Sequence, residues 1–140
     1  MDNCLDEKQL AASDAVPFWT KMAPASIPSK PALHDAFLAV IDCVPAGGRL
    51  LDLGCGDGSL TAKIAESYPC LYLVGVDVNA DAIKAACGLA LAANMDQLTF
   101  QVGNVTELQY PPKVSFNLVL AQLVLSVVGG PEQRKKFLRE

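Results

Sequence analysis

The stretch that decides the fold is Leu51-Asp52-Leu53-Gly54-Cys55-Gly56-Asp57-Gly58-Ser59-Leu60. Glycines occupy every second position from Gly54 to Gly58, directly after the short apolar run 49–53. A side chain at these positions would keep a ligand away from the backbone, and tight turns after strands often require a positive φ. The apolar residues of 59–68 then have helical spacing. The stretch therefore predicts a strand, a glycine-rich turn that faces a ligand, and a helix.

Helices and strands alternate on both sides of this turn. An amphipathic helix is expected over 33–44, and a helix capped by Asn79 is expected to end near Asn94. Apolar or alternating patterns predict further strands over 71–76, 98–102 and 114–120. Because strands that alternate with helices form a parallel sheet covered by helices on both faces, the sequence predicts an α/β fold.

The composition predicts the domain organisation and limits the classes of partner that the protein can bind. Residues 1–31 contain four prolines among small and polar residues, so we expect a partly flexible arm followed by one domain over 32–140. The acidic N-terminus lacks the features of a signal peptide, which predicts a cytoplasmic protein. A net charge of −4 gives little attraction for nucleic acid, and no run is long enough for a membrane span. Five cysteines without a C-x-x-C pair predict no metal site.

Two kinds of ligand suit a glycine-rich turn between a strand and a helix: a dinucleotide and a nucleoside-like cofactor. The dinucleotide pattern G-x-G-x-x-G, begun at Gly54, needs Gly or Ala where this chain has Ser59. The carboxylates of Asp52 and Asp57 would repel a pyrophosphate but attract the amino group and sulfonium of S-adenosylmethionine. S-adenosylmethionine is therefore the expected cofactor, and an NAD-dependent oxidoreductase is the less favoured alternative.

A third acidic residue, Asp77, ends the second predicted strand about 20 residues beyond the turn. A carboxylate at this place can accept hydrogen bonds from the 2′ and 3′ hydroxyls of a ribose. The simpler interpretation is that Asp77 supports the start of the helix next to Asn79. Ribose binding is common to both cofactors, so Asp77 does not distinguish between them.

These residues resemble two motifs of the class I, or Rossmann-like, S-adenosylmethionine-dependent methyltransferases. Leu51 to Gly58 resembles the motif hydrophobic-Asp-x-Gly-x-Gly-x-Gly, and Gly75-Val76-Asp77-Val78-Asn79 resembles the second motif. Residues 116–122 are similar to the family's fourth strand. The resemblance implies a Rossmann-like three-layer α/β/α fold with a parallel sheet, incomplete at about four of the family's seven strands, so we expect a chain truncated after the fourth strand.

The resemblance also implies a site. Asn104 stands where the family usually has an acid that meets the adenine amino group, and an amide can still accept that hydrogen bond. Asn117 is expected to have no role, and Cys55 is expected to be a small apolar filler. The catalytic residue is unknown, because methyl transfer depends mostly on alignment of the reactants. The expected cofactor-binding residues are Asp52, Gly54, Cys55, Gly56, Gly58, Asp77, Val78, Asn104, Val105 and Ala121.

The implied activity is methyl transfer from S-adenosylmethionine to a small-molecule or protein acceptor. Ala121-Gln122-Leu123-Val124 stands where many amino-group methyltransferases have Asn-Pro-Pro-Tyr, which weighs against DNA-adenine and glutamine acceptors. His34 is a candidate general base, and Phe18 with Trp19 a candidate cap over the substrate; packing is the simpler interpretation of each.

An incomplete sheet would expose an apolar strand edge, which we expect a partner or a second copy to cover. This edge supports the alternative of a catalytically incomplete methyltransferase-like module that acts through a partner.

Overall fold

The computed structural model describes residues 36, 38–108, 110, 113–122, 124 and 128–138. The expected arm over 1–31, the candidate cap of Phe18 and Trp19, and His34 lie outside the described residues. Within those residues, no helix has the length and apolar character needed to cross a membrane.

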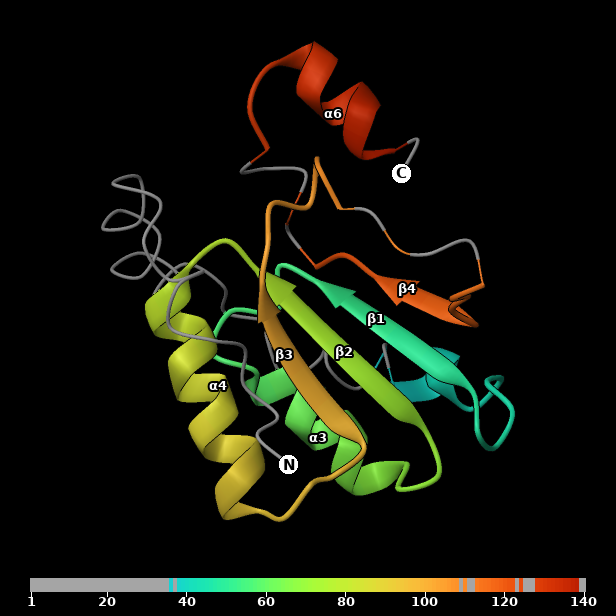
Figure 1. Ribbon diagram of the computed structural model, residues 1–140. Helices are drawn as coiled ribbons and strands as arrows, with labels where there is room; N and C mark the ends of the chain where they lie inside the picture. The colour runs from blue at the N-terminus through green and yellow to red at the C-terminus, as the bar shows by residue number, and fades with distance from the viewer. Residues whose placement is uncertain are drawn as a thin grey trace.

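In the described part of the chain, four parallel strands form the sheet, in the order β3-β2-β1-β4 (Figure 1). β1 pairs with β2 along its whole length, from Arg49 opposite Tyr72 to Leu53 opposite Val76. The chain runs outward from β1 through β2 to β3 and then returns to the other side of β1, where β4 lies. The strand order therefore reverses between β1 and β4, which is the place where open α/β sheets bind ligands at the carboxyl ends of their strands. The bounds are β1 (Arg49–Leu53), β2 (Tyr72–Asp77), β3 (Leu98–Val102) and β4 (Leu118–Leu120).

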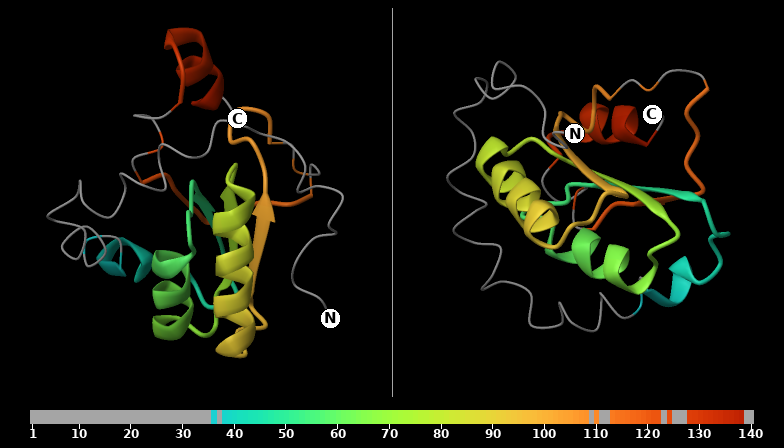
Figure 2. Two further views of the ribbon diagram at one scale, coloured as in Figure 1. Left: turned by 90° about the vertical axis from the view of Figure 1, so that its left-hand side faces the viewer. Right: turned by 60° about the horizontal axis from the view of Figure 1, so that its bottom comes forward.

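Helices cover the sheet as the alternating pattern predicted. α3 (Ser59–Ser67) and α4 (Ala80–Ala92) lie side by side against one face (Figure 2). Asn79 caps α4 as expected, because its side-chain oxygen accepts hydrogen bonds from the backbone N–H groups of Asp81 and Ala82. α6 (Pro131–Phe137) follows β4 and contributes to the opposite face.

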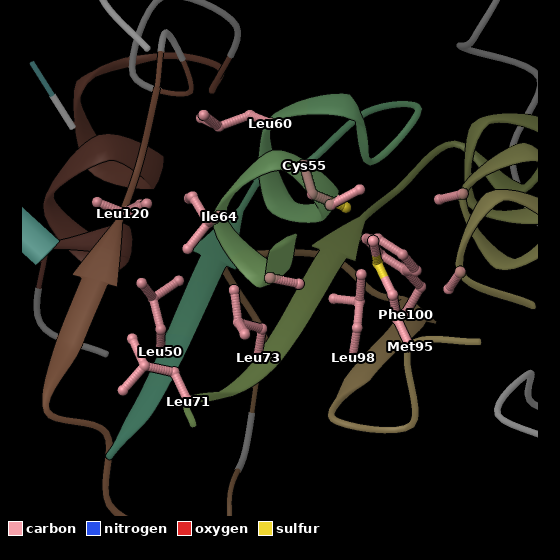
Figure 3. Close-up of a cluster of buried hydrophobic side chains, with 14 of the residues drawn as sticks. Leu50, Cys55, Leu60, Ile64, Leu71, Leu73, Met95, Leu98, Phe100 and Leu120 are labelled. Atoms are coloured by element: carbon pink, nitrogen blue, oxygen red, sulfur yellow. The ribbon is translucent and has the colours of Figure 1, made fainter. Parts of the chain in front are cut away.

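Both faces of the sheet carry a hydrophobic core. On the α3 and α4 side, Leu50, Leu73 and Leu98 come from three neighbouring strands, and Ile64 of α3 packs over them (Figure 3). Burial of each such side chain stabilises the fold by roughly 1.5–3 kcal/mol. The second cluster contains Leu51, Leu53, Val76, Val124, Val128 and Phe137. The α/β fold with a parallel sheet is therefore confirmed.

β4 is shorter than predicted. A strand was expected over 114–120, but it begins only at Leu118. The preceding residue, Asn117, takes over the pairing with Arg49: its backbone N–H donates to the Arg49 carbonyl, and its side-chain oxygen accepts from the Arg49 N–H, both at 2.8 Å. Asn117, which was expected to have no role, therefore fixes the start of the strand.

Candidate cofactor site

The glycine turn folds back onto the end of β2. The backbone N–H groups of Gly54 and Cys55 both donate to the Val76 carbonyl, at 2.7 and 3.0 Å. Gly54, Gly56 and Gly58 have φ values of 73, 58 and 74°, a region that side chains disfavour. The prediction that the turn requires positive φ is confirmed.

The three glycines have different surroundings. A Cβ atom at Gly54 would come within 2.5 Å of Val124, and a Cβ atom at Gly58 would come within 2.5 Å of Phe100. At Gly56, no protein atom lies within 4 Å of the position that a Cβ would take. The space beside Gly54 and Gly58 is thus filled by the protein itself, and only Gly56 leaves room for a ligand to approach the backbone.

Asp77 ties the turn to β2. One of its carboxylate oxygens accepts a hydrogen bond from the N–H of Gly56, and the other accepts one from the N–H of Asn79, both at 2.9 Å. The side chain is half-buried. Because each carboxylate oxygen can accept two hydrogen bonds, each keeps one acceptor position for a ligand. Support of the helix start and binding of a ribose are therefore compatible roles for Asp77.

Asp52 lies beneath the turn, with only 2% of its surface exposed. The hydroxyl of Thr61, on α3, donates to its carboxylate at 2.7 Å. Burial raises the pKa of Asp52 to about 6; the hydrogen bond from Thr61 opposes this change, and the charge of Asp77 adds to it. The carboxylate is thus held without a cation paired to it in the described part of the chain.

Cys55 is buried within the turn. Burial raises the pKa of its thiol well above the ordinary value, and the negative charges of Asp52 and Asp77 raise it further. Since the thiolate is the nucleophilic form, this raised pKa makes the Cys55 thiol a poor nucleophile at neutral pH. Its sulfur lies 2.9 Å from the position that a Cβ atom at Gly75 would take, so it fills space against β2. The expectation that Cys55 is an apolar filler is confirmed.

The remaining predicted residues follow the carboxyl ends of β2, β3 and β4. Val78 and Ala121 are exposed, and Val105 is half-buried against the second core cluster. The side-chain oxygen of Asn104 accepts from both the N–H and the hydroxyl of Thr106, at 3.0 and 2.9 Å. Asn104 therefore closes a local turn, which accounts for an amide at this position without a ligand.

Two residues of this edge were not singled out from the sequence. Nothing in the sequence around Thr61 indicates a role, because its hydrogen-bond partner Asp52 lies on β1, before the glycine turn. Gln122 was noted only as a departure from a motif, yet its side-chain nitrogen is buried and has no hydrogen-bond partner among the residues that the structure describes. Buried polar groups without partners are rare and often mark function.

A separate groove of about 380 Å³ lies on the face opposite α3 and α4. The side-chain nitrogen of Gln101 donates to the Tyr110 hydroxyl there at 2.7 Å, and the Tyr110 and Phe116 rings form a T-shaped pair with centroids 5.0 Å apart. None of the predicted cofactor-binding residues contributes to it, so this groove is not the candidate cofactor site. Its lining consists of Arg49, Tyr72, Val74, Thr99, Gln101, Tyr110, Val114 and Phe116.

The fold and the carboxyl edge of the sheet define the class of the protein. It is an α/β domain of Rossmann-like topology, with a glycine-rich turn after β1 and an aspartate at the end of β2. Residues 45–138 match the model of a family described as a methyltransferase domain. The chain therefore belongs to the methyltransferase domain family.

Two proteins with similar sequences are also named as methyltransferases. A release factor glutamine methyltransferase from Aliivibrio fischeri is 29% identical over 112 residues, which cover 73% of this chain and 39% of the relative. A ribosomal RNA small subunit methyltransferase C from Shewanella loihica is 53% identical over 47 residues, 34% of this chain and 14% of the relative. The chain thus spans well under half of the length of these relatives. Because one of them is named for an RNA, they do not support the expectation that nucleic acid is excluded as a partner.

Solved structures share the fold. One is a SAM-dependent methyltransferase from Thiobacillus denitrificans in complex with S-adenosyl-L-homocysteine. It superimposes with a TM-score of 0.61 at 22% identity, over 78% of this chain and 43% of that one. At this identity the likeness concerns the arrangement of strands and helices.

Proposed function

We propose that this chain binds S-adenosylmethionine at the carboxyl edge of β1 and β2, and that its activity is transfer of the methyl group to an acceptor. The observation that carries the proposal is the contact between Asp77 and Gly56. The Asp77 carboxylate holds the N–H of Gly56 at 2.9 Å, beside the position of the turn where no protein atom fills the space of a side chain. A nucleoside can therefore lie against the backbone with its ribose hydroxyls next to a carboxylate.

The residues around this contact fit the cofactor. S-adenosylmethionine supplies a methyl group activated by a positively charged sulfur. Asp77 would accept hydrogen bonds from the ribose, and the buried carboxylate of Asp52 would place negative charge below the turn. The remaining predicted contacts would come from Val78, Asn104 and Val105 beyond β2 and β3, and from Ala121 beyond β4. Alignment of the acceptor with the methyl group then supplies most of the rate enhancement that the protein must provide.

The same edge is poorly suited to NAD. A pyrophosphate binds at a helix N-terminus through free backbone N–H groups. Here the Asp57 carboxylate already accepts from the N–H of Ser59, the first residue of α3, at 3.1 Å. A pyrophosphate at this position would have to displace this carboxylate. An NAD-dependent oxidoreductase is therefore disfavoured by charge as well as by the residue at position 59.

The acceptor is proposed to be a small molecule or a protein. The segment after β4 lacks the Asn-Pro-Pro-Tyr signature, which weighs against a glutamine side chain even though one relative carries that acceptor in its name. Since another relative is named for ribosomal RNA, an acceptor screen should contain RNA beside proteins and small molecules.

Isothermal titration calorimetry tests the cofactor directly. We expect S-adenosylmethionine and S-adenosylhomocysteine to bind and NAD not to bind. Replacing Asp77 with alanine should weaken both by roughly 10- to 150-fold, because it removes hydrogen bonds to a charged group. Asp96→Ala is the matched control, since Asp96 is an exposed carboxylate outside the site, and it should leave the affinity unchanged. Tight binding of NAD, or equal affinity in the Asp77 variant, would contradict the proposal.

A catalytically incomplete module that acts through a partner is the second candidate. The observation that favours it is the edge of the described sheet: β4 has only three residues, and Val119 within it is 50% exposed. An unpaired strand of this kind is a surface on which another chain can pair. Cofactor binding without methyl transfer to any acceptor of the screen, together with association of the protein in sedimentation experiments, would favour this candidate.

A further inference from the structure

The groove on the sheet face opposite α3 and α4 is built largely from the strands themselves. Side chains at alternate positions of a strand share a face, so Arg49 lies on the same face of β1 as Leu51 of the second core cluster. Arg49 pairs with Tyr72 across β1 and β2, and Val74 pairs with Thr99 across β2 and β3. Three neighbouring strands therefore contribute to the floor of the groove.

Aromatic side chains give the groove apolar walls. The rings of Tyr110 and Phe116 form a T-shaped pair with centroids 5.0 Å apart, and both residues are half-buried. The side chain of Tyr72 is 58% exposed, so a large part of its surface stays open to the solvent. Aromatic rings pack against one another in offset or edge-to-face arrangements. The groove can therefore hold a flat aromatic body.

The polar groups of the groove include donors that have no acceptor. Arg49 is the charged residue among the described lining residues, and no carboxylate pairs with its guanidinium in the part of the chain that the structure describes. The hydroxyl oxygen of Tyr110 accepts from the side chain of Gln101 at 2.7 Å, which leaves the hydroxyl proton for another acceptor. A guanidinium has five N–H donors and accepts no hydrogen bond. An anionic acceptor group therefore complements the groove.

We propose that this groove binds a small aromatic carboxylate, with the carboxylate on the guanidinium of Arg49 and the ring against the aromatic side chains. Its volume of about 380 Å³ lies in the lower part of the range of roughly 300–1,000 Å³ that small-molecule pockets have. The planar guanidinium matches the two oxygens of a carboxylate with parallel hydrogen bonds. One cation among apolar walls suits a head group with a single negative charge.

The groove is separate from the candidate cofactor site. Arg49 begins β1, whereas the glycine turn follows Leu53, the last residue of the strand. At about 3.3 Å per residue, the two ends of β1 lie roughly 13 Å apart. An aromatic carboxylate in the groove would therefore leave the turn open, and the inference does not depend on the proposed function.

The test compares two probes of the same shape. Calorimetry of the unchanged protein with 2-naphthoate and with 2-naphthamide separates the effect of the charge from that of the rings. We expect 2-naphthoate to bind about 5- to 30-fold more tightly, because an ion pair at a partly exposed site gains from hydrogen bonds to a charged group. Intermolecular nuclear Overhauser effects between the naphthalene protons and the rings of Tyr110 and Phe116 should locate the probe in the groove.

Arg49→Met tests the charged contact. The variant keeps an unbranched side chain and removes the guanidinium, so the affinity for 2-naphthoate should fall to that for 2-naphthamide, which should not change. The variant should fold, because Arg49 pairs with β2 and with Asn117 through its backbone. Lys84→Met is the matched control, since Lys84 is an exposed cation on α4, on the other side of the sheet. This control should leave both affinities unchanged.

Three results would overturn the inference. They are equal affinity of the unchanged protein for the two probes, a preference for 2-naphthoate that persists in Arg49→Met, and displacement of 2-naphthoate by S-adenosylhomocysteine. The last result would place the probe at the cofactor site and would not count against the proposed function. Failure of S-adenosylmethionine to bind, in contrast, overturns the proposed function and leaves this inference standing. The comparison of the two probes in the unchanged protein does not depend on the stability of any variant.

Discussion

The ring of Phe100 occupies the space into which a side chain at Gly58 would project. Its Cζ atom lies 2.5 Å from the ideal Cβ position of Gly58, and the Cβ atom of Ala86 lies 2.8 Å from it. Gly56, two residues earlier, has a similar positive φ but no protein atom within 4 Å. Gly58 is therefore a packing position that joins the turn to α4 and β3, whereas Gly56 faces the candidate site.

This difference predicts unequal costs for two alanine substitutions. Gly58→Ala should lower the free energy of unfolding by about 2–4 kcal/mol, because a clash with Phe100 adds to the cost of positive φ. Gly56→Ala should lower it by about 1–2 kcal/mol, because only the cost of positive φ applies. Urea denaturation of both variants measures the difference. Equal losses would show that the packing around Gly58 does not govern the stability of the turn.

Local sequence patterns were sufficient to predict much of the fold. The strands predicted over 49–53 and 98–102 have those bounds in the structure, because runs of apolar or alternating residues report the period of a strand directly. The cap at Asn79 was predictable for a similar reason, since its hydrogen bonds reach only two and three residues along the chain. The position of Asp77 at a strand end followed from the same pattern.

Contacts between distant parts of the chain were not predictable in this way. Nothing near Gly58 in the sequence indicates that Phe100 fills its side-chain space. The start of β4 depends on the pairing of Asn117 with Arg49, and the burial of Asp52 depends on α3 through Thr61. These relationships arise only once the crossovers have brought the strands together, so residue type and spacing alone do not contain them.

The free cysteines should differ sharply in reactivity. Cys43 and Cys70 are exposed, whereas Cys55 is buried and the pKa of its thiol is raised by burial and by neighbouring carboxylates. We expect N-ethylmaleimide to label Cys55 on the order of 100-fold more slowly than the other two at pH 7, as peptide mass spectrometry would measure. Labelling in urea, where all three should react alike, is the control. Rapid labelling of Cys55 in the folded protein would mean that the turn opens readily.

The unpartnered amide of Gln122 predicts a stabilising substitution. Its buried nitrogen has no hydrogen-bond partner in the described part of the chain, and such a group costs about 1–3 kcal/mol. Gln122→Met keeps the length of the side chain and removes the polar group, so it should raise the free energy of unfolding by about 1 kcal/mol. Chemical denaturation of the cofactor-free protein gives this value.

Gln101→Met is the matched control for this prediction. The Gln101 amide donates to the Tyr110 hydroxyl at 2.7 Å, so its replacement should destabilise the protein by about 1 kcal/mol. If both substitutions destabilise the protein to the same extent, the amide of Gln122 makes a favourable interaction in the folded state. The buried amide would then no longer support a ligand site at this edge of the sheet.

The burial of Asp52 predicts how stability depends on pH. Its pKa in the folded protein is about 6, above the ordinary value of 3.8, so the folded state holds the proton more tightly than the unfolded chain. The stabilisation that this proton provides is complete below about pH 3.8 and is lost as the pH rises through 6. In the cofactor-free protein, the ionised carboxylate thus lowers stability at neutral pH.

Asp52→Asn should reverse this loss, because the amide keeps an acceptor for Thr61 and carries no charge at any pH. The free energy of unfolding of the variant should exceed that of the unchanged protein by on the order of 3 kcal/mol at pH 7.5. This difference should shrink toward zero near pH 4. Urea denaturation at several pH values measures both curves without cofactor. Curves that stay parallel between pH 4 and pH 7.5 would mean that Asp52 ionises as freely in the folded protein as in water.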